Sequence, residues 1–362
     1  MSHKYVLLKE VCEKASSNIA QKDLAECDGI YPIYGASGYI KSVDFFQQAK
    51  DYIAIVKDGA GIGRAIKLPA KSSVIGTMQY VLPKDNINIS YLYYAICSMH
   101  LEKYFSGATI PHIYFRDYQN EQLPLPTLEE QAKIANVFGR IDYFIKKEKE
   151  QLINLDKLVK SRFIEMFGDP VTNQKGWEKV RLADKCSIIT GNTPPRANKE
   201  YYGSYIEWIK SDNITSNMYL TQAAEYLSLE GLVVGRKVDP GSILMTCIAG
   251  SLKSIGNVAI ANRPITFNQQ INAVVPNEQN TLFMYEQFKL AKEYITSDVN
   301  MALKGILSKG QLSEKQFIFP PIDLQNQFAD FVAQVDKSKL AIQQSLDELE
   351  TLKKSLMQQY FG

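Results

Sequence analysis

The sequence has no apolar run of about 18 residues, the length that a membrane-spanning helix requires. Its first residues, Met1 to Glu10, do not have the pattern of a secretory signal peptide. The five cysteines are scattered and never spaced Cys-x-x-Cys, and the three histidines stand apart from one another. This distribution predicts neither a zinc site nor a disulfide framework. We therefore expect a cytoplasmic protein that holds no metal and whose cysteines are reduced core residues.

A strong excess of charge is also missing. The formal net charge is +2, and no segment of the chain departs far from neutrality. A nucleic-acid-binding domain usually has a larger basic excess, so charge alone does not predict a nucleic-acid partner. The 45% of apolar residues in 362 is enough to build two or three well-buried domains.

The clearest positive feature is an internal repeat. Residues 126–168 recur without a gap as residues 320–362, at a constant offset of 194. Both copies begin at a proline and end in Phe-Gly. Further matches include Gln131 with Gln325, Asp142 with Asp336, Leu158 with Leu352 and Lys160 with Lys354. The repeat indicates a duplicated unit.

Both copies have apolar residues at spacings of three and four, which predicts two long amphipathic helices with coiled-coil-like stripes. Gly168 and Gly362 suit a left-handed cap at their carboxyl ends. Because the second helix leaves the domain that the first one enters, we expect an antiparallel pair. The domains would then be related by a pseudo-twofold axis, as suits a split DNA site.

The segments that precede the two helices share a plan of short strands, turns and one amphipathic helix, which predicts mixed α/β domains. The predicted organisation has four parts: 1–124 (domain one), 125–168 (helix one), 169–318 (domain two) and 319–362 (helix two). The fold class is α/β or α+β, with two such domains separated by a pair of long antiparallel helices.

Four runs have a distinctive pattern of glycines, aromatic residues and polar residues. In domain one they are residues 31–40 (YPIYGASGYI) and 57–64 (KDGAGIGR); in domain two, 190–196 (TGNTPPR) and 208–214 (WIKSDNI). These runs resemble the target-recognition domains of type I restriction-modification specificity subunits. The entries into the helices, LPTLEEQ at 125–131 and FPPIDLQ at 319–325, match the same family. The resemblance covers the whole chain.

This resemblance implies a subunit that reads a bipartite sequence in double-stranded DNA and recruits two N6-adenine methyltransferase subunits. S-adenosylmethionine would then be bound by those partners, and this chain would need no cofactor. Whether endonuclease or translocase subunits join the complex stays open. Leu324 stands where the first copy has Glu130, so the two methyltransferase contacts are not expected to be identical.

The candidate DNA-binding residues lie in turns, strand ends and glycine-containing loops. The glycine-rich run 59–64 lacks the spacing of a phosphate-cradling loop and is interpreted as a tight hairpin turn. Amide side chains could bind adenine edges and the cations could bind phosphates or base edges; ordinary turn, strand or surface roles are alternatives for each. The candidates are Tyr34, Ser37, Tyr39, Lys57, Arg64 and Gln79 in domain one, and Arg196, Lys210, Lys253, Asn268, Gln269, Gln270, Lys304 and Lys309 in domain two.

Apolar residues that widen the stripes of the long helices are the candidate partner-binding residues. We expect methyltransferase helices to complete a bundle against them. They are Phe138, Phe144, Phe163, Phe328 and Phe331.

The sequence has no glycine-rich cofactor loop with the Asp/Asn-Pro-Pro-Tyr/Phe motif of an amino-methyltransferase, no P-loop and no nucleophile elbow. Glu207 and Lys210 are the nearest approach to a nuclease site. We therefore predict no catalytic residues and a non-catalytic recognition subunit. One alternative is a nuclease or modification enzyme with an unrecognised active site; another is a coiled-coil adaptor that binds only proteins, which would not explain the paired α/β domains.

Overall fold

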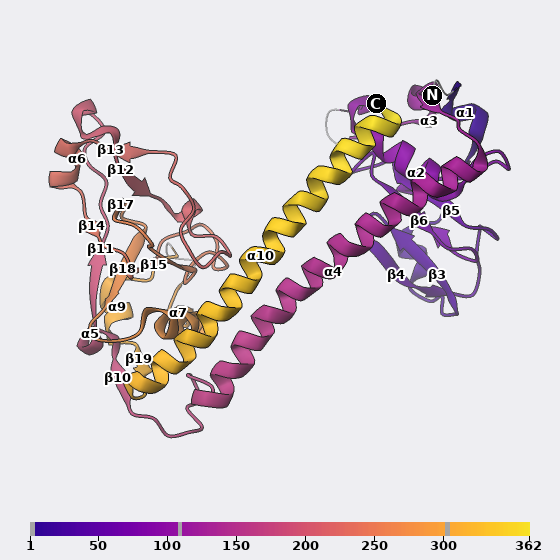
Figure 1. Ribbon diagram of the computed structural model, residues 1–362. Helices are drawn as coiled ribbons and strands as arrows, with labels where there is room; N and C mark the ends of the chain where they lie inside the picture. Colours follow the sequence, from indigo (N-terminus) through magenta and orange to yellow (C-terminus); the bar gives the residue numbers. More distant parts are fainter. Residues whose placement is uncertain (1–3, 108–110, 301–304) are drawn as a thin grey trace. The chain divides into compact units, whose positions relative to one another are not determined.

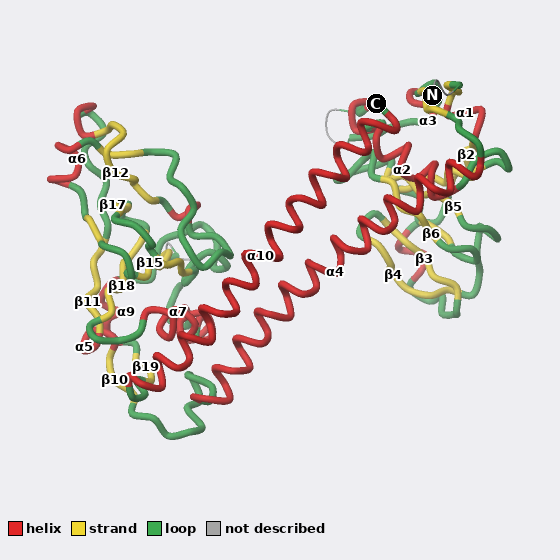
Figure 2. The backbone as a smooth tube through the Cα atoms, viewed as in Figure 1, coloured by secondary structure: helices red, strands yellow, loops and turns green. Residues whose placement is uncertain are grey.

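The computed structural model describes residues 4–107, 111–300 and 305–362. The chain divides into two compact units: unit 1 contains residues 1–150 and 343–362, and unit 2 contains 151–342. Each unit combines one α/β domain with a half of each long helix (Figures 1 and 2). The units follow the same plan, and each is described by itself.

The strands of unit 1 form three small sheets with the orders β1-β9, β2-β8-β5-β6 and β4-β3-β7. Strand β5 lies inside its sheet and its five residues are all buried. Ile53 and Ile55 belong to one apolar cluster, whereas Tyr52, Ala54 and Val56 belong to another. Alternate residues of a strand point to opposite faces, so the continuous apolar run reflects a sheet covered on both sides. The strands are β1 (Tyr5–Leu7), β2 (Cys12–Ser16), β3 (Tyr31–Gly35), β4 (Gly38–Val43), β5 (Tyr52–Val56), β6 (Ala65–Leu68), β7 (Ser73–Val74), β8 (Met78–Pro83) and β9 (Gln122–Pro124).

Helix α2 (Ile89–Ser98) supplies buried residues to the core of unit 1. Its first turn is capped by the Asn88 side chain, which accepts the N–H groups of Ser90 and Tyr91 at 2.9 and 3.1 Å. Helix α2 ends before His100, which has a φ of +51°, and a short 3₁₀ helix follows. The remaining helices are α1 (Leu8–Val11), η1 (Gln21–Leu24), η2 (Leu101–Tyr104) and α3 (Phe115–Tyr118).

Unit 2 repeats this plan with the sheet orders β10-β19, β11-β18-β15-β16 and β13-β12-β17-β14. Leu244 and Ala273 face one apolar cluster, while Ile243, Met245 and Val274 face the other, so the central sheet is again buried on both sides. The strands are β10 (Lys179–Arg181), β11 (Cys186–Thr190), β12 (Tyr202–Ile209), β13 (Tyr226–Leu227), β14 (Lys237–Val238), β15 (Ile243–Thr246), β16 (Val258–Ile260), β17 (Ile265–Phe267), β18 (Ile271–Pro276) and β19 (Gln316–Ile318).

Helix α7 (Thr281–Leu290) of unit 2 corresponds to α2, and Asn280 caps it as Asn88 caps α2. The break near its end comes at Ala291, after which α8 begins. The other helices of the unit are α5 (Leu182–Lys185), η3 (Lys199–Tyr201), η4 (Ser211–Asn213), α6 (Leu229–Val234), α8 (Lys292–Thr296) and α9 (Lys309–Glu314).

The two long helices are α4 (Leu128–Phe167) and α10 (Ile322–Phe361), each of 40 residues. In unit 1 the Asp142 carboxylate pairs with Lys353 at 2.5 Å, and Lys149 pairs with Glu350 at 2.8 Å. Residue numbers that increase along α4 are therefore paired with residue numbers that decrease along α10. The Lys339–Asp156 ion pair of unit 2 continues this order. The predicted antiparallel pairing is confirmed in each unit. Gly168, with a φ of +75°, provides the predicted left-handed cap of α4.

A buried glutamine in the first turn of each long helix attaches the helix to its domain. The Gln131 side chain accepts the backbone N–H of the cap residue Asn88 at 2.7 Å and donates to the Pro126 carbonyl at 2.9 Å. Gln325 does the same to Asn280 at 3.0 Å and to Pro320 at 2.8 Å. Both glutamines are 1% exposed. One side chain thus joins the start of the long helix, the proline before it and the cap of the domain helix.

The prediction that all five cysteines lie in the core was partly wrong. Cys12, Cys186 and Cys247 are buried, whereas Cys27 is half-buried and Cys97 is exposed. All five are free thiols. Burial raises the pKa of the Cys12 thiol to about 12, so this cysteine stays protonated and packs as a small apolar residue.

Replacing Gln325 by Ala should selectively destabilise unit 2. The change leaves the half-buried Asn280 N–H and the buried Pro320 carbonyl without their partner, which should cost roughly 2 kcal/mol of unfolding free energy. Both tryptophans of the chain, Trp177 and Trp208, belong to unit 2, so urea unfolding followed by tryptophan fluorescence reports on this unit. Gln327→Ala, at an exposed position of the same turn, is the control. An equal loss in both variants would contradict the role given to Gln325.

Candidate functional site

In unit 2, the ends of two parallel strands bring several candidate residues together. Strands β12 and β17 pair in parallel, with Ile209 opposite Phe267. Because the carboxyl ends of parallel strands lie at the same edge, the chain leaves both strands side by side. It continues as Lys210 and Ser211 after β12 and as residues 268–270 after β17. We call these residues the unit 2 edge.

The three amides of the unit 2 edge have different roles. Asn268 is buried: its Oδ1 accepts the Gln270 N–H at 3.1 Å, and its Nδ2 donates to the Gln270 Oε1 at 3.0 Å. Both ends of the Asn268 amide therefore hold the turn together, and its predicted DNA contact stays a prediction. Gln269 is exposed and receives a hydrogen bond from the Thr193 hydroxyl. Gln269 and the half-buried Gln270 stay candidates.

Beside this edge, two cations share one carboxylate, and both lie over the ring of Trp208. The Arg196 Nη1 lies 2.7 Å from Glu225 Oε2, and the Lys210 ammonium contacts the other carboxylate oxygen. The guanidinium carbon of Arg196 lies 4.6 Å from the ring centre of Tyr202 and 4.9 Å from that of Trp208. Hydrogen bonds from Arg196 and from Lys210 hold the pKa of the Glu225 carboxyl below its ordinary value. Two predicted residues thus lie together, joined by an acidic residue that was not predicted.

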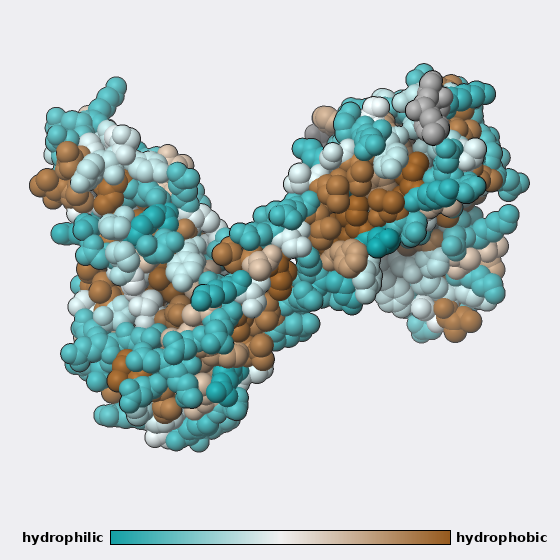
Figure 3. Space-filling model, viewed as in Figure 1, coloured by the Kyte–Doolittle hydropathy of each residue, from teal (hydrophilic) through white to brown (hydrophobic). Residues whose placement is uncertain are grey.

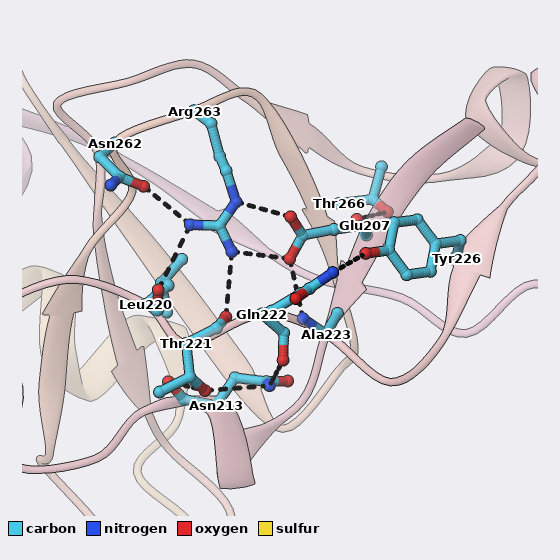
Figure 4. A network of polar contacts seen from close by, with 10 residues as sticks. All are labelled: Glu207, Asn213, Leu220, Thr221, Gln222, Ala223, Tyr226, Asn262, Arg263 and Thr266. Atoms are coloured by element: carbon cyan, nitrogen blue, oxygen red, sulfur yellow. Dashed lines mark hydrogen bonds and ion pairs between the residues drawn. The ribbon is translucent and has the colours of Figure 1, made fainter. Parts of the chain in front are cut away.

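A second ion pair of unit 2 is structural (Figure 4). The Arg263 guanidinium binds both oxygens of the Glu207 carboxylate at 2.6 and 2.7 Å and also donates to the carbonyls of Leu220 and Thr221 and to the Asn262 side chain. Glu207 Oε2 further accepts the Ala223 N–H at 2.8 Å. The hydrogen bond from Arg263 is the main cause that holds the pKa of Glu207 below its ordinary value of 4.5.

The network in Figure 4 bears on the nuclease alternative. Glu207 is occupied by Arg263, and Lys210 by Glu225, so these two residues do not form a shared acidic and basic site. Among residues 4–107, 111–300 and 305–362, no group of three or more His, Cys, Asp or Glu side chains is placed to hold a metal ion.

Unit 1 has an edge of the same construction. Strands β3 and β7 pair in parallel, with Tyr34 opposite Val74. The Ile75 N–H donates to the Tyr34 carbonyl at 2.9 Å, and the Lys57 N–H donates to the Thr77 carbonyl at 3.0 Å. The hairpin between β3 and β4 places Ser37 and Tyr39 beyond this edge, with both side chains exposed.

The glycine-rich run 59–64 connects the antiparallel strands β5 and β6 and opens no helix, which confirms that it is a hairpin connection. At Gly63, with a φ of +81°, a Cβ atom would lie 2.6 Å from the Glu102 nitrogen, so only glycine fits. Lys57 is paired with Asp58 at 3.3 Å. Arg64 is exposed and has no ion-pair partner within the described part of the chain.

The other candidate DNA-binding residues are dispersed. Gln79 is 2% exposed and donates to the Tyr118 hydroxyl inside unit 1. Its amide thus has an internal partner, and its DNA contact stays a prediction. Lys253 and Lys309 are exposed in unit 2. Lys304 lies outside the described residues.

The predicted partner-binding phenylalanines fall into two groups. Phe138, Phe163 and Phe328 are fully buried and fill the space between the long helices and the domains. They expose no apolar area in this structure, and their partner contacts stay predictions. Phe163, for example, lies 5.5 Å from Phe283 of α7, ring centre to ring centre. Phe331 is half-buried. Phe144 is 47% exposed and stays a candidate.

Sequence reasoning missed Glu225, Tyr202 and Trp208. One signal was available: Trp208 and Lys210 are two residues apart at a strand end, a spacing that places side chains on one face. The role of Glu225 had no such signal, because it reaches the cations from a different segment. The pairing of β12 with β13 and the hydrogen bond from the Trp208 backbone N–H to the Glu225 carbonyl at 2.9 Å bring Glu225 beside the cations.

The comparisons with known proteins agree with this duplicated plan. The family described as the type I restriction modification DNA specificity domain matches residues 3–156 and 174–351. The HindI specificity subunit of Haemophilus influenzae is 36% identical over 118 residues, which cover 32% of this chain and 25% of that protein. The MjaIX specificity subunit of Methanocaldococcus jannaschii is 22% identical over 300 residues, covering 76% of this chain and 69% of the relative.

Two solved structures share the fold. The S subunit of a type I restriction-modification system from M. genitalium has a TM-score of 0.65 at 16% identity, covering 100% of this chain and 96% of that one. A structure that describes complex assembly and conformational transition of a type I R-M system has a TM-score of 0.57 at 16% identity, covering 99% and 97%.

The folded plan is that of a protein with two α/β recognition modules on paired long helices. Since the matched family extends over both modules, the chain belongs to the type I restriction modification DNA specificity family. No helix within the described ranges is both long and apolar enough to cross a membrane.

Replacing Arg263 by Met should destabilise unit 2 in a pH-dependent way. Arg263 lowers the pKa of Glu207 in the folded state, so the pair stabilises fully above the ordinary pKa of 4.5 and loses this contribution as pH falls through the lower folded value. We expect a loss of roughly 2 kcal/mol at pH 7 that shrinks below pH 4.5.

Urea unfolding at several pH values, followed by tryptophan fluorescence, measures this difference. Arg236→Met, which removes an exposed cation of the same domain, is the matched control and should change the unfolding free energy little. A loss at Arg263 that is the same at every pH would contradict the ionic account of the network.

Proposed function

We propose that this chain is the sequence-specific DNA-binding subunit of a type I restriction-modification system. Each α/β domain would read one half of a bipartite site in double-stranded DNA, in the cytoplasm. The observation that carries the proposal is that both domains use the same construction, a parallel strand pair whose carboxyl ends present polar and basic residues. The family membership of the whole chain supports this assignment.

The two edges differ in chemistry, and this supports separate half-sites. The unit 1 edge offers tyrosines, Ser37 and Lys57, whereas the unit 2 edge offers Lys210 and the amides Gln269 and Gln270. Tyrosine hydroxyls, amides and cations meet different hydrogen-bonding groups on base edges. Arg64 and Lys253 are exposed cations that could bind phosphates and position the duplex.

The chain would carry no active site and would act by placing methyltransferase subunits on the DNA. Those partners would bind S-adenosylmethionine, and endonuclease subunits could join the same assembly. The rival is a nuclease or modification enzyme with a divided site of its own. Methyl transfer or DNA cleavage by the purified chain without partners would favour that rival.

The surface of the long helices supports a contact with two partner copies. Leu158 and Leu352 occupy equivalent positions of the repeat and are 47% and 48% exposed; Leu128 and Ile322 are a second such pair. In unit 1, the face drawn in Figure 3 has apolar atoms gathered where Figure 1 draws α4 and α10 beside α2. Equivalent exposed apolar residues on a duplicated helix suit two copies of one partner.

Replacing Phe144 by Ser should weaken methyltransferase binding, because the change removes exposed apolar area from α4 without opening a core cavity. Co-purification of the chain with a tagged methyltransferase partner measures the effect, and we expect a several-fold lower yield of complex. Phe46→Ser, at an exposed phenylalanine of the unit 1 domain, should leave the yield unchanged. Equal losses in both variants would contradict a docking surface on α4.

Exchanging residues 1–124 for another domain of the same family should change one half of the methylated motif and leave the other half intact. The physical reason is that each domain has its own core and its own edge. Methylome sequencing of a host that carries the chimera and its methyltransferase partner reads the motif directly. Simultaneous loss of both half-sites, with the chimera folded and bound to its partner, would count against independent reading.

A further inference from the structure

Glu225 of unit 2 holds two cations that would otherwise be free to bind DNA phosphates. Its carboxylate contacts both Arg196 and Lys210, so the three charges sum to +1 within one small cluster. The Arg196 guanidinium also lies over the rings of Tyr202 and Trp208, which restrict its movement. Trp208 is itself fixed: its indole N–H donates to the Asn192 carbonyl at 3.2 Å.

The Arg196 and Arg263 guanidinium groups differ in how many of their N–H donors are already hydrogen-bonded. Arg263 has all five of its N–H donors occupied, by Glu207, Asn262 and two backbone carbonyls. Arg196 donates one hydrogen bond, to Glu225, among the described residues. Its side chain is 55% exposed, compared with 30% for Arg263. Arg263 is therefore saturated and structural, whereas Arg196 is held in place with donors to spare.

The charge of Glu225 decides which kind of acceptor those donors favour. A phosphate that approaches Arg196 and Lys210 also comes close to the carboxylate, and like charges at such distances repel. A carbonyl oxygen or ring nitrogen on a base edge carries no net charge and avoids this repulsion. The Arg196 guanidinium is held by one carboxylate oxygen and lies over two aromatic rings. Its remaining planar donors suit the paired acceptors of a guanine edge.

We propose that Glu225 is a specificity-determining residue: it disfavours backbone phosphate at the Arg196–Lys210 cluster and positions the Arg196 guanidinium for an uncharged acceptor on a base edge. This inference rests on the proposed function, since it requires that unit 2 binds DNA. Glu225 acts through Arg196 and is a positioning residue, whereas Arg196 makes the contact.

The test is Glu225→Gln in the complex of the full chain with its methyltransferase partner. Two duplexes are compared: one with the motif that the complex methylates, and one with the unit 2 half-site scrambled. Fluorescence anisotropy over a range of salt concentrations gives both affinities and their salt dependence. We expect the affinity for the scrambled duplex to rise roughly three- to tenfold. The slope of its log affinity against log salt should steepen by about 0.9, as one new phosphate contact predicts.

The affinity for the methylated-motif duplex should rise less, so that the ratio of the two affinities falls. Arg196→Lys should behave differently: it keeps the charge but loses the planar fork, so it should weaken binding to the motif duplex and leave the scrambled duplex unchanged. Glu200→Gln removes an exposed carboxylate of the same domain that has no ion-pair partner within the described residues. It is the matched control and should leave the ratio unchanged.

The proposal is overturned if Glu225→Gln leaves both affinities unchanged. It is also overturned if Glu225→Gln and Glu200→Gln each raise both affinities by the same factor, because that result would reflect net charge alone. Failure of the wild-type complex to bind either duplex would overturn the proposed function as well. Thermal unfolding of each variant, followed by tryptophan fluorescence, shows that unit 2 is folded in the samples compared.

Discussion

The interaction on which the rest of the structure depends is the buried glutamine in the first turn of each long helix. Gln131 and Gln325 each bind the cap of a domain helix and the proline that precedes the long helix. A buried amide with several partners fixes both position and orientation, because any shift leaves polar groups unsatisfied. The domain and its share of the helices therefore form one cooperative body, and each edge is held on that body rather than on a loose linker.

Duplication gives one chain two domains of similar plan, as the proposed reading of two half-sites requires. The glutamine, the capping asparagine and the orders of the two-stranded sheet and the central sheet recur in both units, whereas the sheet that carries the edge has three strands in unit 1 and four in unit 2. The strand ends that form the edges also carry different side chains. Residues that build the core are constrained by packing on both faces of a sheet, and residues at the edges are not. The Glu207–Arg263 network adds rigidity to unit 2 alone and uses two charges that belong to the fold rather than to the surface.

Much of this fold could be predicted from the sequence, because helical periodicity is a local signal and the repeat runs without a gap. The long helices, their antiparallel pairing and the central strands of each domain are confirmed. The short strands β3, β12 and β17 were not identified from the sequence. The parallel pairing that creates each edge could therefore not be predicted. The site was harder for the same reason: Gln79, Asn268 and Phe163 looked available in the sequence, but burial gives them internal partners. Glu225 could not be found without the fold.

The central claim is that this chain directs adenine methylation to a split site. Methylome sequencing of the strain that carries the gene, compared with a strain from which the gene is deleted and with one in which it is restored, tests this most directly. The account predicts that one two-part adenine-methylated motif with a fixed gap is lost on deletion and returns on restoration. An unchanged set of methylated motifs, in strains where the chain and a methyltransferase partner are produced, would contradict it.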